Sequence, residues 1–156
     1  MASPEVRDRV NDQLLDIFDK ILVTEQRALQ KGSFKDLSIA EMHTLEGVGL
    51  YDSRTMSETA ARLSITTGTL TVAVDKLVRK GYVERVRDEV DRRIVRVSLT
   101  RKGKLAYRMH MKFHTLLVER ILDPLDPIQQ QVLLTVLERI STFVGDQYRR
   151  YNLTED

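Results

Sequence analysis

Residues 87–104, RDEVDRRIVRVSLTRKGK, hold ten charged side chains, seven of them Lys or Arg. Such side chains bind phosphate, and an arginine can also enter a narrow DNA groove. The wider segment 54–104 has 13 Lys and Arg against 6 Asp and Glu, a net charge of +7, whereas the rest of the chain has −5. This asymmetry favours a nucleic-acid-binding surface in the middle of the chain.

The elements that position these charges follow from periodicity. YVERVR and IVRVSL alternate every second residue and predict a β-hairpin, joined by DEVDR, with Val95, Val97 and Leu99 on one side. The segment before it predicts two short helices with a tight break, the first beginning near Ser57 and the second capped by Thr66 and ended by Gly81. The residues predicted to be buried on these two helices are Ala60, Ala61, Leu63, Leu70, Val74, Leu77 and Val78.

Four further helices are predicted outside this segment. The first is capped by Ser3 and runs from Pro4 to about Lys31, and the second has the capping-box sequence SIAE over 38–41. A fifth is capped by Thr100 and ends before Pro124, and the sixth begins at about Pro127. The fold class is therefore mainly α (α+β), with about six helices and a two-stranded β-hairpin.

Helix, tight turn, helix and hairpin is the order of a winged helix-turn-helix. The Asp91-x-Arg93 pattern followed by VSLTRKG, directly after LVRKGYVERVRD, resembles the MarR family of transcriptional regulators over roughly 38–104. The flanking helices match that family in number and order. The resemblance implies a single MarR-type domain over 1–156, in which 38–100 bind DNA and 1–37 and 101–156 form a helical dimerisation region.

The resemblance implies a role for each basic residue of the hairpin tip. Arg93 would enter the minor groove with Asp91 orienting it, while Arg92 and Lys76 would contact phosphates. The helix beginning TTGTLTV offers hydroxyl and methyl groups, which suit phosphates and thymine methyls but cannot form the bidentate Arg–guanine pair. An A·T-rich operator is therefore expected. The predicted DNA-binding residues are Thr66, Thr67, Gly68, Thr69, Thr71, Val72, Lys76, Asp91, Arg92 and Arg93.

Each of these features has a simpler explanation when it is taken alone. Threonines at a helix start often only cap it, and an arginine-rich hairpin is often a solvated edge. A winged helix can also bind proteins instead of DNA. The combined order of elements favours double-stranded DNA, and a steep salt dependence of binding would separate the two alternatives.

The first, fifth and sixth helices have apolar stripes that are wide for a chain of 156 residues, most clearly IQQQVLLTVLERISTFVGDQY. An internal core accounts for part of this apolar surface. In the family, the terminal helices of two chains interlock into a symmetric dimer. We therefore expect a homodimer on a pseudo-palindromic site.

The three histidines have the spacing of an effector or metal site. His110 and His114 are one helical turn apart, and His43 lies on the second helix. They look like the zinc ligands of MarR-type repressors of zinc uptake, with Glu41, Glu25 or water as a fourth ligand. Hydrogen bonding within a helix junction and a polar part of an effector site are the two other interpretations.

The sequences DLSIAEMHTLEGVG and YRMHMKFH, with all three histidines, look like the fatty-acid biosynthesis repressor subgroup of the family. That resemblance implies long-chain acyl-acyl carrier protein as co-repressor, with the acyl chain in an apolar tunnel. A stripe of Met and Phe at helical spacing is more often ordinary core. The candidate effector residues are Leu14, Phe18, Met42, His43, Met109, His110, Phe113 and His114.

Several classes of protein are disfavoured by what the chain lacks. It has no cysteine, which excludes disulfides and thiolate metal ligands. It has no apolar run of roughly 18 residues and no leader-like start, so we expect a cytoplasmic protein without a membrane contact. No nucleophile and base stand at suggestive positions, so we expect no enzyme activity and no required cofactor.

Overall fold

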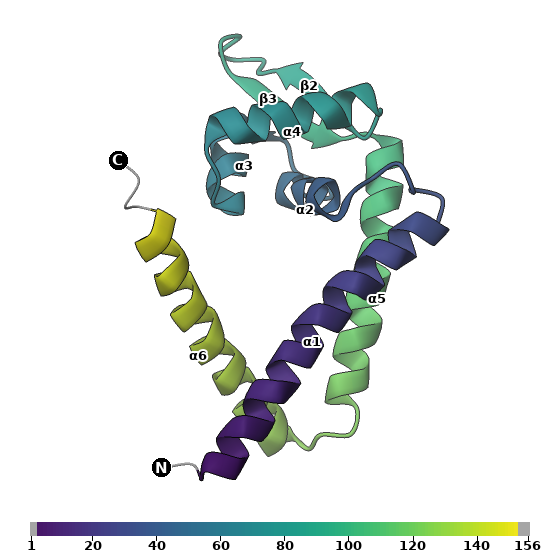
Figure 1. The fold of residues 1–156 in the computed structure, drawn as a ribbon. Coiled ribbons are helices and arrows are strands. Elements are labelled where there is room, and N and C mark those ends of the chain that lie inside the picture. Colours follow the sequence, from purple (N-terminus) through teal and green to yellow (C-terminus); the bar gives the residue numbers. More distant parts are fainter. Residues whose placement is uncertain (1–2, 153–156) are drawn as a thin grey trace. The chain divides into compact units, whose positions relative to one another are not determined.

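The computed structural model describes residues 3–152, in two units that divide after Met111. The elements of the first unit, shown in Figure 1, are α1 (Pro4–Lys31), α2 (Ile39–Val48), β1 (Arg54–Thr55), α3 (Met56–Leu63), α4 (Thr67–Arg79), β2 (Val83–Arg87) and β3 (Val95–Leu99). Helix α5 (Arg101–Leu122) crosses the division, and α6 (Pro127–Asn152) lies in the second unit. The six predicted helices and the predicted hairpin are confirmed.

Side-chain caps fix where four of the helices begin. Ser3, Ser38, Thr66 and Thr100 each accept a hydrogen bond from the backbone N–H three residues further on, as the sequence predicts. These caps satisfy N–H groups that the first turn of a helix leaves without an internal partner. Local sequence alone therefore sets the start of α1, α2, α4 and α5.

Helix α3 begins at Met56, one residue earlier than the predicted start near Ser57. Thr55 accepts a hydrogen bond from the N–H of Glu58, and the Glu58 carboxylate accepts one from the N–H of Thr55. This reciprocal capping box has the sequence pattern T-x-x-E. The start of α3 at Met56 could therefore have been predicted from the sequence.

Two residues predicted to be buried are exposed, Ala61 on α3 and Val78 on α4. Each directly follows a buried residue, Ala60 and Leu77 respectively. One residue turns an α-helix by about 100°, which rotates the next side chain off the buried face. The predicted stripes were therefore one residue too wide.

The sheet has three antiparallel strands in the order β1–β3–β2, rather than the two predicted from alternation. In the central strand, Val97 pairs with Arg54 of β1 and with Arg85 of β2. Strand β1 has only two residues, too few to produce an alternating pattern. Its pairing attaches the hairpin to the segment that leads into α3.

The core of the first unit lies between α2, α3, α4 and the sheet. It contains buried apolar residues from α1, α2, α3, α4, β2, β3 and α5, and its fully buried members include Met42, Leu45, Val48, Leu70, Val74, Leu77, Tyr82 and Val97. Burying this many large side chains removes apolar surface from water and fixes the packing of α3 and α4 against the sheet.

Gly103 allows the first turn of α5 to approach the chain between α4 and β2. A Cβ atom at this position would lie 2.1 Å from the carbonyl oxygen of Tyr82. That distance is far below van der Waals contact, so only glycine fits without a backbone shift. The hydroxyl of Thr100 donates to the carbonyl of Gly81 at 2.7 Å in the same region.

The second unit contains the end of α5 and the whole of α6. Gln130 of α6 donates to the carbonyls of Leu122 and Leu125, which holds the turn before Pro127. Within residues 3–152, no helix combines the length and the apolar character needed to cross a membrane.

Candidate nucleic-acid interface

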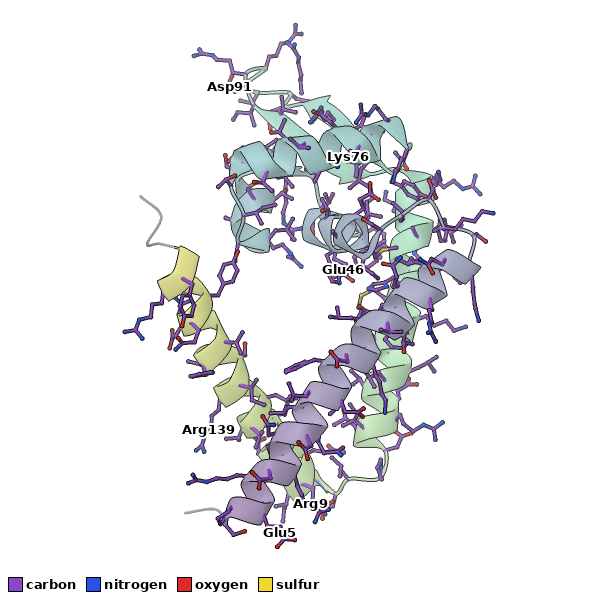
Figure 2. The ribbon with its side chains drawn as sticks, in the orientation of Figure 1. Glu5, Arg9, Glu46, Lys76, Asp91 and Arg139 are labelled. Carbon is purple, nitrogen blue, oxygen red and sulfur yellow. The ribbon has the colours of Figure 1, made fainter. Side chains whose placement is uncertain are left out.

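Helix α4 has one face buried in the core and the opposite face exposed to solvent. Leu70, Val74 and Leu77 are fully buried, with a spacing that keeps them on one side of the helix. Figure 2 shows Lys76 on this helix and Asp91 at the tip of the neighbouring hairpin. Helix α4 packs on α3 in the helix-turn-helix arrangement that the sequence predicts.

The threonine hydroxyls of α4 are used largely within the helix itself. Thr71 donates to the carbonyl of Thr67 at 2.8 Å, and the hydroxyls of Thr66 and Thr69 lie 2.9 Å apart. Val72 is 58% exposed, and the start of the helix at Thr67 and Gly68 is exposed. The surface that α4 offers is therefore rich in methyl groups.

An ion pair connects α4 to the hairpin. Arg85 of β2 donates to the carboxylate of Asp75 at 2.5 Å. Both side chains are partly exposed, so the pair contributes little to the free energy of unfolding. It does link the helix and the strand that would approach DNA together.

The wing is the hairpin of β2, β3 and residues 88–94 between them. Asp91, Arg92 and Arg93 lie exposed at its tip, as predicted. The Asp91 carboxylate accepts a hydrogen bond from the backbone N–H of Arg93 at 3.0 Å. The guanidinium itself lies 3.7 Å from that carboxylate and is 95% exposed. Asp91 thus fixes the backbone of the turn and makes only a long ion pair with the exposed Arg93 guanidinium.

Sequence reasoning missed two residues at the base of the wing, Asp88 and Arg96. The Arg96 guanidinium donates to the Asp88 carboxylate, and this hydrogen bond lowers the pKa of Asp88 to about 2, together with backbone N–H groups of the turn. An aspartate two and three residues before turn N–H groups is a recognisable turn signal. The pairing with Arg96 is not visible in the sequence, because it spans the turn.

A second cluster of polar residues lies between α1, α2 and α5 in the first unit. The Nε2 atom of His110 lies 3.9 Å from Glu25 and 2.9 Å from Glu46, and that of His43 lies 4.0 Å from Glu25. Glu25 and His110 are buried. Glu25, His43 and His110 each offer a ligand atom within 4.8 Å of the others, a set that fits a divalent transition metal.

This arrangement selects among the predicted ligands. Glu41 forms an ion pair with Lys80 at 2.8 Å instead of joining the histidines. Burial raises the pKa of Glu41, but the hydrogen bonds from Lys80 and from the Ser38 N–H outweigh it and lower the pKa. Glu46 was missed, although it lies three residues after His43 on the same helix face. His114 belongs to the second unit, where it contacts the ring of Phe113.

The predicted effector residues have different environments. Met42 is a fully buried core residue, whereas Phe18 and Met109 are more than half exposed. Leu14 lines a shallow groove of 380 Å³ along α1 with apolar neighbours. Phe113 is half-buried in the second unit.

Comparisons with known proteins decide the family. Residues 35–94 match the sequence profile of the MarR family. The chain is 40% identical to Streptococcus pneumoniae FabT, whose crystal structure is a complex with DNA; the match covers 90% of this chain and 99% of that one, with a TM-score of 0.81. The chain belongs to the MarR family. It is a DNA-binding transcriptional regulator of the winged-helix type and not an enzyme.

Curated HTH-type transcriptional regulators are similar to this chain at lower coverage. Bacillus subtilis YfiV, an HTH-type transcriptional regulator, is 31% identical over 108 residues, which is 67% of each chain. Staphylococcus saprophyticus SarZ is 36% identical over 69 residues, 44% of this chain and 47% of SarZ. With SarZ and with B. subtilis YkoM, the chain matches only about half of the relative's length.

Proposed function

We propose that this regulator represses fatty-acid biosynthesis genes with acyl-acyl carrier protein as co-repressor. The observation that carries the proposal is the similarity to FabT, which extends over 90% of the chain and well beyond the residues that the MarR profile matches. The structural match therefore also includes the helices outside the DNA-binding segment, which are the part expected to distinguish effectors. The chain itself resembles the fatty-acid biosynthesis repressors over the segments that contain its three histidines.

The operator in this proposal is A·T-rich. The methyl-rich surface of α4, with Val72 at its centre, suits thymine methyl groups in the major groove. The exposed guanidinium of Arg93 suits the negative potential of a narrow A·T minor groove, and Arg92 and Lys76 suit phosphates. The remaining proposed contacts are Thr66, Thr67, Gly68, Thr69, Thr71 and Asp91.

The regulator acts in this proposal as a homodimer on a pseudo-palindrome. Large apolar side chains are exposed along α1 and along α6, and a second copy would remove them from water. Those of α1 include Val6, Val10, Leu15, Phe18 and Leu22, and those of α6 include Val132, Leu134, Leu137, Phe143 and Val144.

The co-repressor is tested by measuring operator affinity. A duplex selected from a random pool by the purified protein serves as the probe, with and without long-chain acyl-acyl carrier protein. We expect about a tenfold gain in affinity, within the range typical of coupled sites. Carrier protein without an acyl chain is the control. An equal effect of both forms, or of neither, would contradict the proposed co-repressor.

The cluster of Glu25, His43 and His110 favours a second candidate, a zinc-responsive MarR-type repressor. Its ligand types, two imidazoles and one carboxylate, are those of a zinc site. Zinc, when bound, would connect α1, α2 and α5.

The zinc content of the purified protein tests whether it is a zinc-responsive repressor. Protein purified without an affinity tag would be dialysed against zinc and its metal content measured, for the wild type, Glu25→Gln and His110→Ala. The zinc hypothesis expects one ion per chain in the wild type, loss in both variants, and tighter operator binding with zinc. Wild-type protein that stays metal-free, with operator affinity unchanged on zinc addition, would leave the cluster as a hydrogen-bonded helix junction. Bound zinc without any change in operator affinity would make it a structural metal site and would contradict zinc-responsive repression.

A further inference from the structure

The tip of the wing is not held in place by apolar packing. The last pair of the β2–β3 ladder is Arg87 with Val95. Two further backbone hydrogen bonds follow, from the N–H of Asp88 to the carbonyl of Ile94 at 3.0 Å and from the N–H of Ile94 to the carbonyl of Asp91 at 2.9 Å. Beyond it, Val90 is 98% exposed. An isolated two-stranded hairpin is only marginally stable in water. The direction of the tip must therefore depend on contacts at its base.

The two carboxylate oxygens of Asp88 make different contacts there. Oδ1 accepts hydrogen bonds from the N–H groups of Val90, at 2.9 Å, and Asp91, at 3.1 Å, which shape the turn. Oδ2 accepts the hydrogen bond from Nε of Arg96. Of the two side chains in this second contact, Asp88 is 14% exposed and Arg96 is 35% exposed. Local turn formation and the connection to β3 therefore use separate atoms.

Arg96 carries that connection to the start of the helix-turn-helix. Its Nη1 atom donates to the carbonyl of Ser53 at 3.0 Å, just before β1, and Arg96 pairs with Thr55 in the sheet. The carboxylate of Glu58, which caps α3, lies close enough to attract the guanidinium. One arginine thus contacts the wing turn and the segment that leads into α3.

We propose that Asp88 and Arg96 are positioning residues that hold the wing in the direction that delivers Arg93 to the minor groove. The proposal rests on the proposed role of the wing in reading an A·T-rich site. Neither residue needs to touch DNA, because the guanidinium of Arg96 is already bonded to Asp88 and Ser53. Without this network, the tip keeps its turn but loses its fixed angle to α3 and α4.

Base substitution in the operator separates minor-groove from major-groove reading. An I·C pair presents the minor groove of A·T and the major groove of G·C, because inosine lacks the N2 amino group. Each A·T pair of a duplex selected by the wild type would be replaced in turn by I·C and by G·C. Positions that tolerate I·C but not G·C are read in the minor groove.

The test compares Asp88→Asn and Arg96→Met with the wild type on these duplexes. Asparagine at 88 keeps the Oδ1 acceptor of the turn and removes the charge that binds Arg96. At the minor-groove positions, we expect the wild type to bind the I·C duplex about tenfold more tightly than the G·C duplex. For both variants, we expect this difference in affinity to be less than about twofold. Discrimination at major-groove positions should be unchanged, as should the thermal midpoint.

Arg87→Gln is the matched control, since it removes one exposed wing arginine outside the network. It should retain the preference for I·C, with at most a uniform loss of affinity. If the wild type shows no position with this preference, the minor-groove role of the wing is wrong, and the positioning proposal fails with it. If the wild type shows the preference and both variants keep it, only the positioning proposal is wrong. The positioning proposal would also be wrong if both variants lost affinity equally for all duplexes and unfolded at a lower temperature. That result would indicate that Asp88 and Arg96 only stabilise the fold.

Discussion

Arg93 combines a backbone held by the turn with a side chain that is almost fully exposed. Its N–H is bonded to Asp91, but its guanidinium is almost fully exposed and makes only a long contact. Removing that side chain therefore costs the folded protein very little. Arg93 is available for binding without being needed for folding.

We predict that Arg93→Ala weakens binding to an A·T-rich operator by about tenfold to a hundredfold, the usual value for an inserted or base-contacting arginine. The thermal midpoint and the oligomeric state should not change. Affinities would be measured by fluorescence anisotropy for the duplex selected by the wild type and for a second duplex in which the flanking base pairs are G·C. Arg92→Ala is the comparison, since a phosphate contact should weaken binding to both duplexes equally. Normal operator binding by Arg93→Ala would refute the assignment of Arg93.

The sequence predicted residues well where their role depends on neighbours in the chain. The four caps and the exposed tip of the wing are of this kind, because their partners lie within a few residues. The contact of Asp88 with Arg96 depends on the hairpin register, and that of Glu46 with His110 depends on how α2 meets α5. Such pairs follow from tertiary structure, and a single sequence gives no signal for them.

At the scale of elements, the start of α5 is packed unusually closely. Gly103 leaves no room for a methyl group, because the carbonyl oxygen of Tyr82 occupies the space. This contact sets the distance between α5 and the chain that connects α4 with β2. The close approach is a constraint on the backbone, not only on side chains.

Gly103→Ala should therefore lower the free energy of unfolding by about 1–3 kcal/mol, as overpacking does in well-packed sites. Gly68 in α4 is the control, since the nearest atom to its Cβ would be a threonine hydroxyl at 3.9 Å. Gly68→Ala should raise stability by about 0.5–1 kcal/mol, because alanine favours the helix. Urea denaturation followed by circular dichroism measures both. A stable Gly103→Ala protein would mean that the start of α5 can shift freely.

The sequence failed to predict strand β1 and predicted too wide a buried face for α4. Strand β1 has two residues and exists only because β3 pairs with it, so no window of sequence could reveal it. The helix boundaries were predicted to within a residue or two because capping side chains mark them. The extra width predicted for the buried face of α4 came from counting Val78 with Leu77.

At the scale of the whole molecule, the exposed apolar side chains of α1 and α6 are too numerous for an isolated chain. Leu137 is 51% exposed on α6, and Thr142 of the same helix is exposed on the other side of it by helical spacing. These two positions allow one test of which face is covered.

We predict a mass of two chains in sedimentation equilibrium at micromolar concentration. Leu137→Asp should shift the protein towards a single chain, because a charge would be buried in an apolar interface. Thr142→Asp introduces the same charge on the opposite side and should leave the mass unchanged. Equal masses for all three proteins would show that this face of α6 is not the interface.

Val72 has a consequence for how this regulator can diverge. Its side chain is 58% exposed, while the residues that hold α4 in place lie on the opposite face. A longer donor at this position would change which bases the helix prefers without disturbing the packing. Specificity and stability are therefore separable at this site, and a new set of target genes could be acquired through one codon at no cost in folding.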